Sequence, residues 1–234
     1  DSEIPEKDSF MRRKPKGVVA AITAWNFPFA VPLWLICPSV VEGNTVILKP
    51  SRETACVGNK IAEYTHKAGF PPGVINVVQG SCGDLLVKHP NTHVVLFVGS
   101  NAVGSEIRKT VAGFDNKMAA CEMGGKNALI ILDDANLDIA VNAAVISAFK
   151  TSGQRCTSAS RMIIHEKALA EFEKRFVEMV KKIKIGDPLD ESVFMGPVIN
   201  KAATEKIAMY NDLAKKEGAK ILVDGGRLTD SPYK

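Results

Sequence analysis

Short apolar runs alternate with helix-length segments along this chain, and no other feature of the sequence restricts the fold as strongly. Several runs are enriched in β-branched residues and bordered by Gly or Pro, which is typical of strands; they span residues 18–23, 45–48, 74–78 and 94–98. Segments with helical periodicity lie between them, at residues 54–68 and 102–111. Repeated strand–helix–strand units predict an α/β fold in which helices cover a parallel sheet.

A second alternating set follows the glycine pair Gly124-Gly125. We expect strands at residues 128–132, 162–165 and 220–223, and helices at residues 137–150, 168–182 and 201–218. Because paired glycines let the backbone turn without a Cβ penalty, we place a domain boundary near Gly124. Residues 1–14 have the pattern of a partial strand.

The composition argues against several classes of function. The formal charge of +4 is spread along the chain without a basic block, so a nucleic-acid-binding surface is not expected. The long apolar stretch at residues 27–41 is interrupted by Pro28, Pro32 and Pro38, and the charged start of the chain lacks an apolar signal core. Membrane insertion and export are therefore not expected, and we predict a soluble, cytoplasmic protein.

The five cysteines are an odd number without C-x-x-C spacing, which argues against both a disulfide framework and a metal site. Cys156 differs from the others because small and polar residues and Arg155 surround it, and this setting favours the reactive thiolate. Taken alone, a cysteine is more often a packing residue or an inert thiol. We keep that interpretation for Cys37 and Cys56, which lie in apolar or helical surroundings.

Two further side chains are candidates for catalysis. Glu122 lies between apolar residues and the glycine pair, and a carboxylate in an apolar pocket has a raised pKa that suits a general base. The alternative for Glu122 is a salt bridge with Lys126 at the end of a strand. Asn26 offers an amide donor near a strand end, or alternatively forms a turn.

Two segments are candidates for cofactor binding. Lys49-Pro50-Ser51 follows a buried strand, at the edge where parallel sheets bind ligands. The segment from Gly99 and Ser100 to Gly104 opens a helix, whose positive end can hold a phosphate. Because this segment is not a G-x-G-x-x-G motif, an ordinary strand-to-helix turn explains it about as well.

These segments, together with others in the same order along the chain, resemble the aldehyde dehydrogenase superfamily. The motifs are Trp25-Asn26-Phe27-Pro28, Gly43-Asn44-Thr45, Lys49-Pro50-Ser51, Pro72-Gly73-Val74, Phe97-Val98-Gly99-Ser100, Glu122-Met123-Gly124-Gly125-Lys126, Gly153-Gln154-Arg155-Cys156, Gly186-Asp187-Pro188 and Met195-Gly196-Pro197. The motifs around Glu122 and Cys156 are specific to that family.

The resemblance implies oxidation of an aldehyde to a carboxylic acid with NAD(P)+. Cys156 would add to the carbonyl group, and the Asn26 amide would hold the resulting oxyanion. Glu122 would then activate the water that hydrolyses the thioester. The resemblance also implies cofactor-binding roles for Trp25, Lys49, Ser51, Arg52, Gly99, Ser100 and Gly104.

Arg52 departs from the family pattern and bears on the choice of cofactor. Many NAD-preferring relatives carry a glutamate at this position, three residues beyond the lysine. A guanidinium suits the 2′-phosphate of NADP, so we predict that NADP is preferred and that NAD is possible. The alternative is that Arg52 is a surface arginine at a helix start. Leu35 and Val98 also replace a lysine and a threonine that many relatives have near the base.

The resemblance suggests three parts of the chain. We expect residues 1–15 to be a partial strand used in oligomerisation, residues 16–124 an incomplete Rossmann-like cofactor domain, and residues 125–234 the first part of an α/β catalytic domain. Relatives are longer, so we expect a fragment of a protein that forms a homodimer or homotetramer. Segments that help to select the aldehyde lie outside this sequence.

Three alternatives stay open from the sequence. A CoA-acylating relative would transfer the acyl group to CoA, although the complete Glu122 motif favours hydrolysis. A non-catalytic protein could keep the fold, although Cys156, Glu122 and Asn26 together argue against it. An unrelated Rossmann-type binder is the alternative least consistent with the setting of Cys156.

Overall fold

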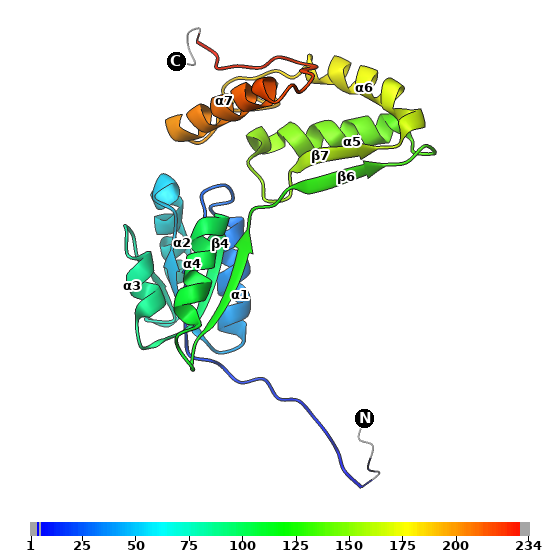
Figure 1. Ribbon diagram of the computed structural model, residues 1–234. Coiled ribbons are helices and arrows are strands. Elements are labelled where there is room, and N and C mark those ends of the chain that lie inside the picture. The colour runs from blue at the N-terminus through cyan, green and yellow to red at the C-terminus, as the bar shows by residue number, and fades with distance from the viewer. Residues whose placement is uncertain (1–3, 5, 230–234) are drawn as a thin grey trace. The chain divides into compact units, whose positions relative to one another are not determined.

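The structure, a computed structural model, describes residue 4 and residues 6–229 (Figure 1). The chain forms two compact units; the first ends at Gly124 and the second begins at Gly125. Each unit pairs parallel strands and packs helices on them, so the predicted α/β fold is confirmed. Within the described part of the chain, no helix is both long and apolar enough to cross a bilayer.

The first unit contains a five-stranded parallel sheet in the order β3-β2-β1-β4-β5. Its strands are β1 (Val18–Ile22), β2 (Thr45–Lys49), β3 (Ile75–Val77), β4 (Thr92–Gly99) and β5 (Met118–Met123). Its helices are α1 (Ala30–Val41), the 3-10 turn η1 (Arg52–Thr54), α2 (Ala55–Lys67), α3 (Gly83–Lys88) and α4 (Asn101–Val111). The predictions of strands near residues 18, 45, 74 and 94 are therefore confirmed.

Helices cover both faces of this sheet. Ile36 of α1 and Ile61 of α2 pack with Val19 and Leu48 on one face. On the other face, Val87 of α3 and Ile107 and Val111 of α4 pack with Ile22, Val95 and Phe97. Successive residues of a strand point to opposite faces, and both β1 and β4 contribute residues to the two clusters. The two clusters make β1 the buried centre of the sheet.

α1, α3 and β5 were not predicted from the sequence. The prolines that interrupt the apolar stretch at residues 27–41 disturb α1 only slightly. Pro28 precedes the helix, and Pro32 lies in its first turn, where a backbone N–H has no intrahelical partner. Pro38 alone lies in the helix interior. β5 has no β-branched residue, and its strand state depends on parallel pairing with β4.

The second unit is built on the parallel pair β6 (Asn127–Ile131) and β7 (Ala159–Ile164). Its helices are α5 (Leu137–Phe149), the 3-10 turn η2 (Lys150–Gly153), α6 (Glu166–Val180) and α7 (Lys201–Lys216). Figure 1 shows α5 lying along the two strands. Ile131, Val141 and Phe172 form its core, and the rings of Phe172 and Phe176 stack at 5.6 Å.

Two predicted strands do not form in the described part of the chain. Residues 220–223 are irregular, and Ile221 and Leu222 are exposed. Residues 6–15 of the expected partial strand also form no strand, whereas residues 1–3 and 5 lie outside the described residues. A strand depends on a neighbour to satisfy its backbone N–H and C=O groups, and neither segment has one here. The β propensity of these two segments is therefore not enough to form a strand without a neighbouring strand to pair with.

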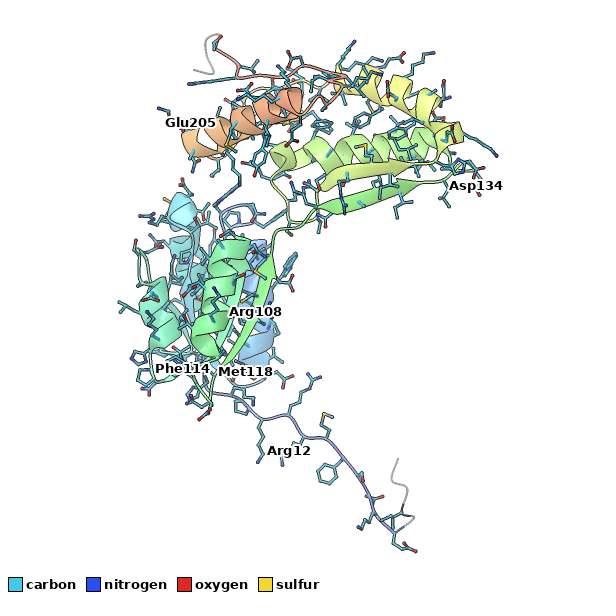
Figure 2. The ribbon with its side chains drawn as sticks, viewed as in Figure 1. Arg12, Arg108, Phe114, Met118, Asp134 and Glu205 are labelled. Carbon is cyan, nitrogen blue, oxygen red and sulfur yellow. The ribbon has the colours of Figure 1, made fainter. Side chains whose placement is uncertain are left out.

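Lys117 is a buried cation, 8% exposed, directly before β5. Its Nζ donates to the carbonyl oxygens of Val87 at 2.9 Å and His89 at 2.7 Å, and lies 4.1 Å from the centre of the Phe114 ring. These carbonyls belong to the C-terminal end of α3, where backbone acceptors lack helical partners. Burial lowers the pKa of the Lys117 ammonium. Figure 2 shows Phe114 and Met118, on either side of Lys117 in sequence, at the same end of the unit.

We expect Lys117→Met to lower the free energy of unfolding by about 1–3 kcal/mol, because the two carbonyls would lose their donor. Lys60→Met is the matched control, since it removes only an exposed ion pair with Glu63. Denaturant titrations of the full-length protein would measure both. An equal loss of stability in the two variants would contradict a structural role for Lys117.

Candidate active site

The predicted site residues of the first unit gather at one edge of its sheet. Because all its strands are parallel, their carboxyl ends lie at the same edge, where open α/β sheets bind ligands. The residues at or just beyond these ends, or in the first turn of the helix that follows, are Trp25, Asn26, Lys49, Ser51, Arg52, Gly99, Ser100, Gly104 and Glu122. Met118, labelled in Figure 2, marks the opposite end of β5.

The carboxyl end of β2 carries two cations. Lys49 is the last residue of β2, is half-buried, and donates from Nζ to the Pro50 carbonyl oxygen at 3.0 Å. Burial lowers the pKa of Lys49, the Cys82 thiol raises it, and the Arg52 guanidinium lowers it further. Arg52 is exposed and begins η1, whose N-cap is Ser51. This end of the strand therefore favours an anionic ligand.

The turn from β4 into α4 is shaped by two glycines. The Ser100 hydroxyl is the N-cap of α4 and accepts from the Val103 N–H at 3.4 Å. A Cβ on Gly99 would approach the Phe97 ring to 2.4 Å, and one on Gly104 would approach the Met123 sulfur to 2.5 Å. Since neither position has room for a side chain, the glycines let the start of α4 pack closely on β4 and β5, with its positive end at the ligand-binding edge of the sheet.

Glu122 is exposed, so the predicted apolar pocket around it is wrong for the described residues of this unit. β5 is an edge strand, and its residues Ala119, Cys121 and Met123 face the cluster beneath α4. Glu122 therefore points to the opposite face of the strand, where it is exposed. Asn26 is half-buried in the bend between β1 and α1.

Cys156 lies in the second unit, on the segment of residues 151–158, which we call the nucleophile loop after the role predicted for Cys156. The Cys156 residue is exposed, and its carbonyl oxygen accepts from Nδ2 of Asn127 at 2.6 Å. The same Asn127 amide donates to the Ser158 carbonyl oxygen at 3.1 Å. Asn127 was not singled out from the sequence, although it directly follows Gly124-Gly125-Lys126. It holds the loop from the start of β6.

The nucleophile loop begins with a left-handed turn. Thr151, Ser152 and Gly153 have φ values of 58°, 56° and 67°. Such backbone costs about 1–3 kcal/mol at each non-glycine residue, so other contacts have to hold it. Within the loop, Nε of Arg155 donates to Oγ1 of Thr151 at 2.9 Å, and the Gln154 N–H donates to the Thr151 carbonyl oxygen at 3.0 Å.

Cys37 and Cys56 were predicted to be packing residues or inert thiols. Packing is wrong, because both are exposed, whereas their inertness stays a prediction. Each lies on the outer side of its helix, since the helices bury Ile36 and Ile61 instead. Periodicity predicted α2, but it did not identify the exposed face of α2 on which Cys56 lies. The described residues also bring together no group of His, Cys, Asp or Glu side chains that could hold a metal ion.

A model of the aldehyde dehydrogenase family matches residues 1–233. The chain belongs to this family. It is 40% identical over 233 residues to the α-ketoglutaric semialdehyde dehydrogenase of Bacillus subtilis (strain 168), a match that covers 97% of this chain and 48% of that protein. The chain thus spans about half the length of that relative.

Solved structures of similar proteins share this fold. The crystal structure of betaine aldehyde dehydrogenase from Staphylococcus aureus in complex with NAD+ has a TM-score of 0.93 at 36% identity, covering 100% of this chain and 47% of that one. An NADP-dependent enzyme of E. coli has a TM-score of 0.89 at 35% identity, covering 92% and 45%.

In this aldehyde dehydrogenase chain, the predicted catalytic residues are divided between the units. Asn26 and Glu122 belong to the first unit with all the predicted cofactor residues, whereas Cys156 belongs to the second. Each unit positions its own residues by backbone geometry. In the first unit, the predicted residues are positioned by the carboxyl ends of the strands. In the second unit, Cys156 is positioned by the left-handed turn before it and by the hydrogen bond from Asn127.

Proposed function

We propose that this chain carries the cofactor-binding and nucleophile-bearing parts of an NAD(P)-dependent aldehyde dehydrogenase that forms a free carboxylic acid. The observation that carries the proposal is Cys156, an exposed thiol on a loop held by Asn127, in a chain of this family. The first unit would be the cofactor domain and the second part of the catalytic domain. We further propose a cytoplasmic homodimer or homotetramer for the full-length protein.

The chemistry assigns one role to each predicted catalytic residue. The Cys156 thiolate attacks the aldehyde carbon and forms a C–S bond. The Asn26 amide stabilises the oxygen of this tetrahedral adduct, together with a backbone N–H near Cys156. A nicotinamide cofactor, when bound, would supply the hydride acceptor that conversion of this adduct to a thioester requires. Glu122 then takes a proton from water, whose attack releases the acid and restores the thiol.

The first unit fits a dinucleotide in several respects. Gly99 and Gly104 leave no side chain at the start of α4, where backbone N–H groups and the Ser100 hydroxyl could approach the pyrophosphate. Lys49 ends β2 and Ser51 follows it, where the adenosine ribose would lie, and Trp25 follows β1. The arrangement of glycines and cations supports binding of NAD(P) at this edge.

We propose NADP as the preferred cofactor because Arg52 is exposed beside the half-buried Lys49. Arg52→Glu should lower the ratio of kcat/KM for NADP to that for NAD by about 10- to 100-fold, since it replaces attraction to the 2′-phosphate by repulsion. Arg12→Glu, the same charge change at an exposed arginine in the N-terminal segment (Figure 2), should leave the ratio unchanged. An unaltered ratio in Arg52→Glu would rule out this preference.

Product analysis tests the activity itself. The full-length protein would be incubated with a panel of aldehydes and with NAD+ or NADP+, with and without CoA. We expect reduction of the cofactor, a free acid as product, and no dependence on CoA. An acyl-CoA product would instead assign the protein to the CoA-acylating group, and no cofactor reduction with any aldehyde would contradict the proposed function.

A further inference from the structure

The left-handed turn in front of Cys156 is tied to a distant segment by side-chain hydrogen bonds. The Ser152 hydroxyl donates to the Gly196 carbonyl oxygen at 2.7 Å and lies 3.2 Å from the Pro197 carbonyl oxygen. Two residues further along, Oε1 of Gln154 accepts from the Ile199 N–H at 2.9 Å. The partners are 44 or 45 residues apart in sequence, so these bonds form only when the unit folds.

Residues 196–199 are themselves anchored at both ends. On one side, Met195 pairs with Ile185 in a parallel bridge, and its carbonyl oxygen accepts from the Gly186 N–H at 3.1 Å. On the other side, Asn200 is the N-cap of α7 and accepts from the Ala203 N–H at 3.0 Å. A segment fixed at both ends can hold the nucleophile loop in place.

Backbone strain makes these bonds necessary. Thr151 and Ser152 are non-glycine residues in the left-handed region, which such residues rarely occupy unless surrounding contacts impose it. Gly153 cannot be replaced without a clash, since a Cβ there would lie 2.9 Å from the Ala148 carbonyl oxygen. The hydrogen bonds of Ser152 and Gln154 oppose relaxation of a turn that ends three residues before the thiol.

We propose that Ser152 and Gln154 are positioning residues, which place Cys156 for attack on the aldehyde by joining the nucleophile loop to residues 196–199. The proposal rests on the proposed function, in which Cys156 is the nucleophile. Neither residue touches the reacting atoms. Each acts through the conformation of the loop, because a small displacement of a nucleophile is enough to slow its reaction.

The test compares Ser152→Ala and Gln154→Met with wild type in the full-length enzyme. Ser152→Thr keeps the hydroxyl and is the conservative rescue for the first. Thr204→Val is the matched control, since it removes a hydroxyl that donates to the Asn200 carbonyl oxygen at 3.3 Å, outside the nucleophile loop. Three quantities are measured for each: kcat, the KM of the cofactor, and the rate at which iodoacetamide alkylates Cys156, followed by peptide mapping.

If Ser152 and Gln154 are positioning residues, their substitution should change kcat without changing the cofactor KM or the rate of Cys156 alkylation. Loss of either hydrogen bond should lower kcat about tenfold, whereas the cofactor KM should stay within about twofold, because the cofactor residues belong to the first unit. Alkylation of Cys156 should also stay within about twofold, since a small reagent reaches an exposed thiol without the alignment that an aldehyde bound beside the cofactor needs. Ser152→Thr and Thr204→Val should have kcat values close to wild type.

Two results would overturn the proposal. One is an unchanged kcat in both Ser152→Ala and Gln154→Met. The other is a parallel fall of kcat and of Cys156 alkylation, which would indicate that the thiol itself has lost reactivity or access, instead of being misplaced relative to the aldehyde. If the wild-type enzyme reduces no cofactor with any aldehyde, the proposed function is wrong, and the positioning role, which depends on it, is wrong as well. The wild-type assay thus distinguishes the two failures.

Discussion

Cys156→Ser in the full-length protein is expected to lower aldehyde oxidation by about three orders of magnitude or more. A serine hydroxyl without a base to deprotonate it is a far weaker nucleophile than a thiolate, so no covalent adduct forms. Cofactor binding should persist, because the predicted cofactor residues lie in the other unit. Initial rates of cofactor reduction and a direct cofactor-binding titration measure the two effects separately.

The chain provides matched controls for this substitution. Cys37 and Cys56 are also exposed thiols, on α1 and α2, and have no predicted part in the chemistry. Cys37→Ser and Cys56→Ser should therefore retain wild-type turnover. Turnover that survives in Cys156→Ser, or an equal loss in either control, would remove the basis for assigning Cys156 as the nucleophile.

Glu122→Gln is expected to block the second half of the reaction. Without a base to deprotonate water, hydrolysis of the thioester should slow by about 10²- to 10⁴-fold, whereas formation of the thioester should continue. Rapid mixing should then show a burst of about one cofactor reduced per active site, followed by a slow phase. Intact-mass spectrometry should detect the acyl group on the protein.

Glu106→Gln is the control for this variant, because Glu106 is an exposed glutamate of the same unit, on α4, 4.0 Å from Lys109. Its steady-state rate should match that of wild type. A Glu122→Gln variant with a wild-type steady-state rate would disprove the base assignment. Loss of the burst as well would place the action of Glu122 before hydrolysis, at formation of the thioester.

The strands that the sequence predicted share a local cause. The runs that became β1, β2 and β4 are rich in β-branched residues and bounded by turn residues, so their strand state follows from local preference and burial. Parallel pairing followed from the intervening helices. The same reasoning placed Lys49 and Gly99 at strand ends, because a residue that follows a parallel strand lies at the carboxyl edge of the sheet.

The errors also have physical causes. Residues 220–223 have the composition of a strand but no described neighbour to pair with, whereas β5 lacks that composition and forms by pairing with β4. Glu122 was expected in an apolar pocket because its neighbours in sequence are apolar. Those neighbours point to the other face of an edge strand, so they do not enclose it.

The sequence by itself determined the α/β class, the order of most strands and helices, and the candidate residues Cys156, Glu122 and Asn26, because propensity, periodicity and motif are local properties. Only the tertiary structure decided that Asn127 holds the Cys156 carbonyl group and that Ser152 and Gln154 bind residues 196–199. These contacts join residues about 30 to 45 positions apart. They depend on how strands and turns pack, which no local pattern encodes.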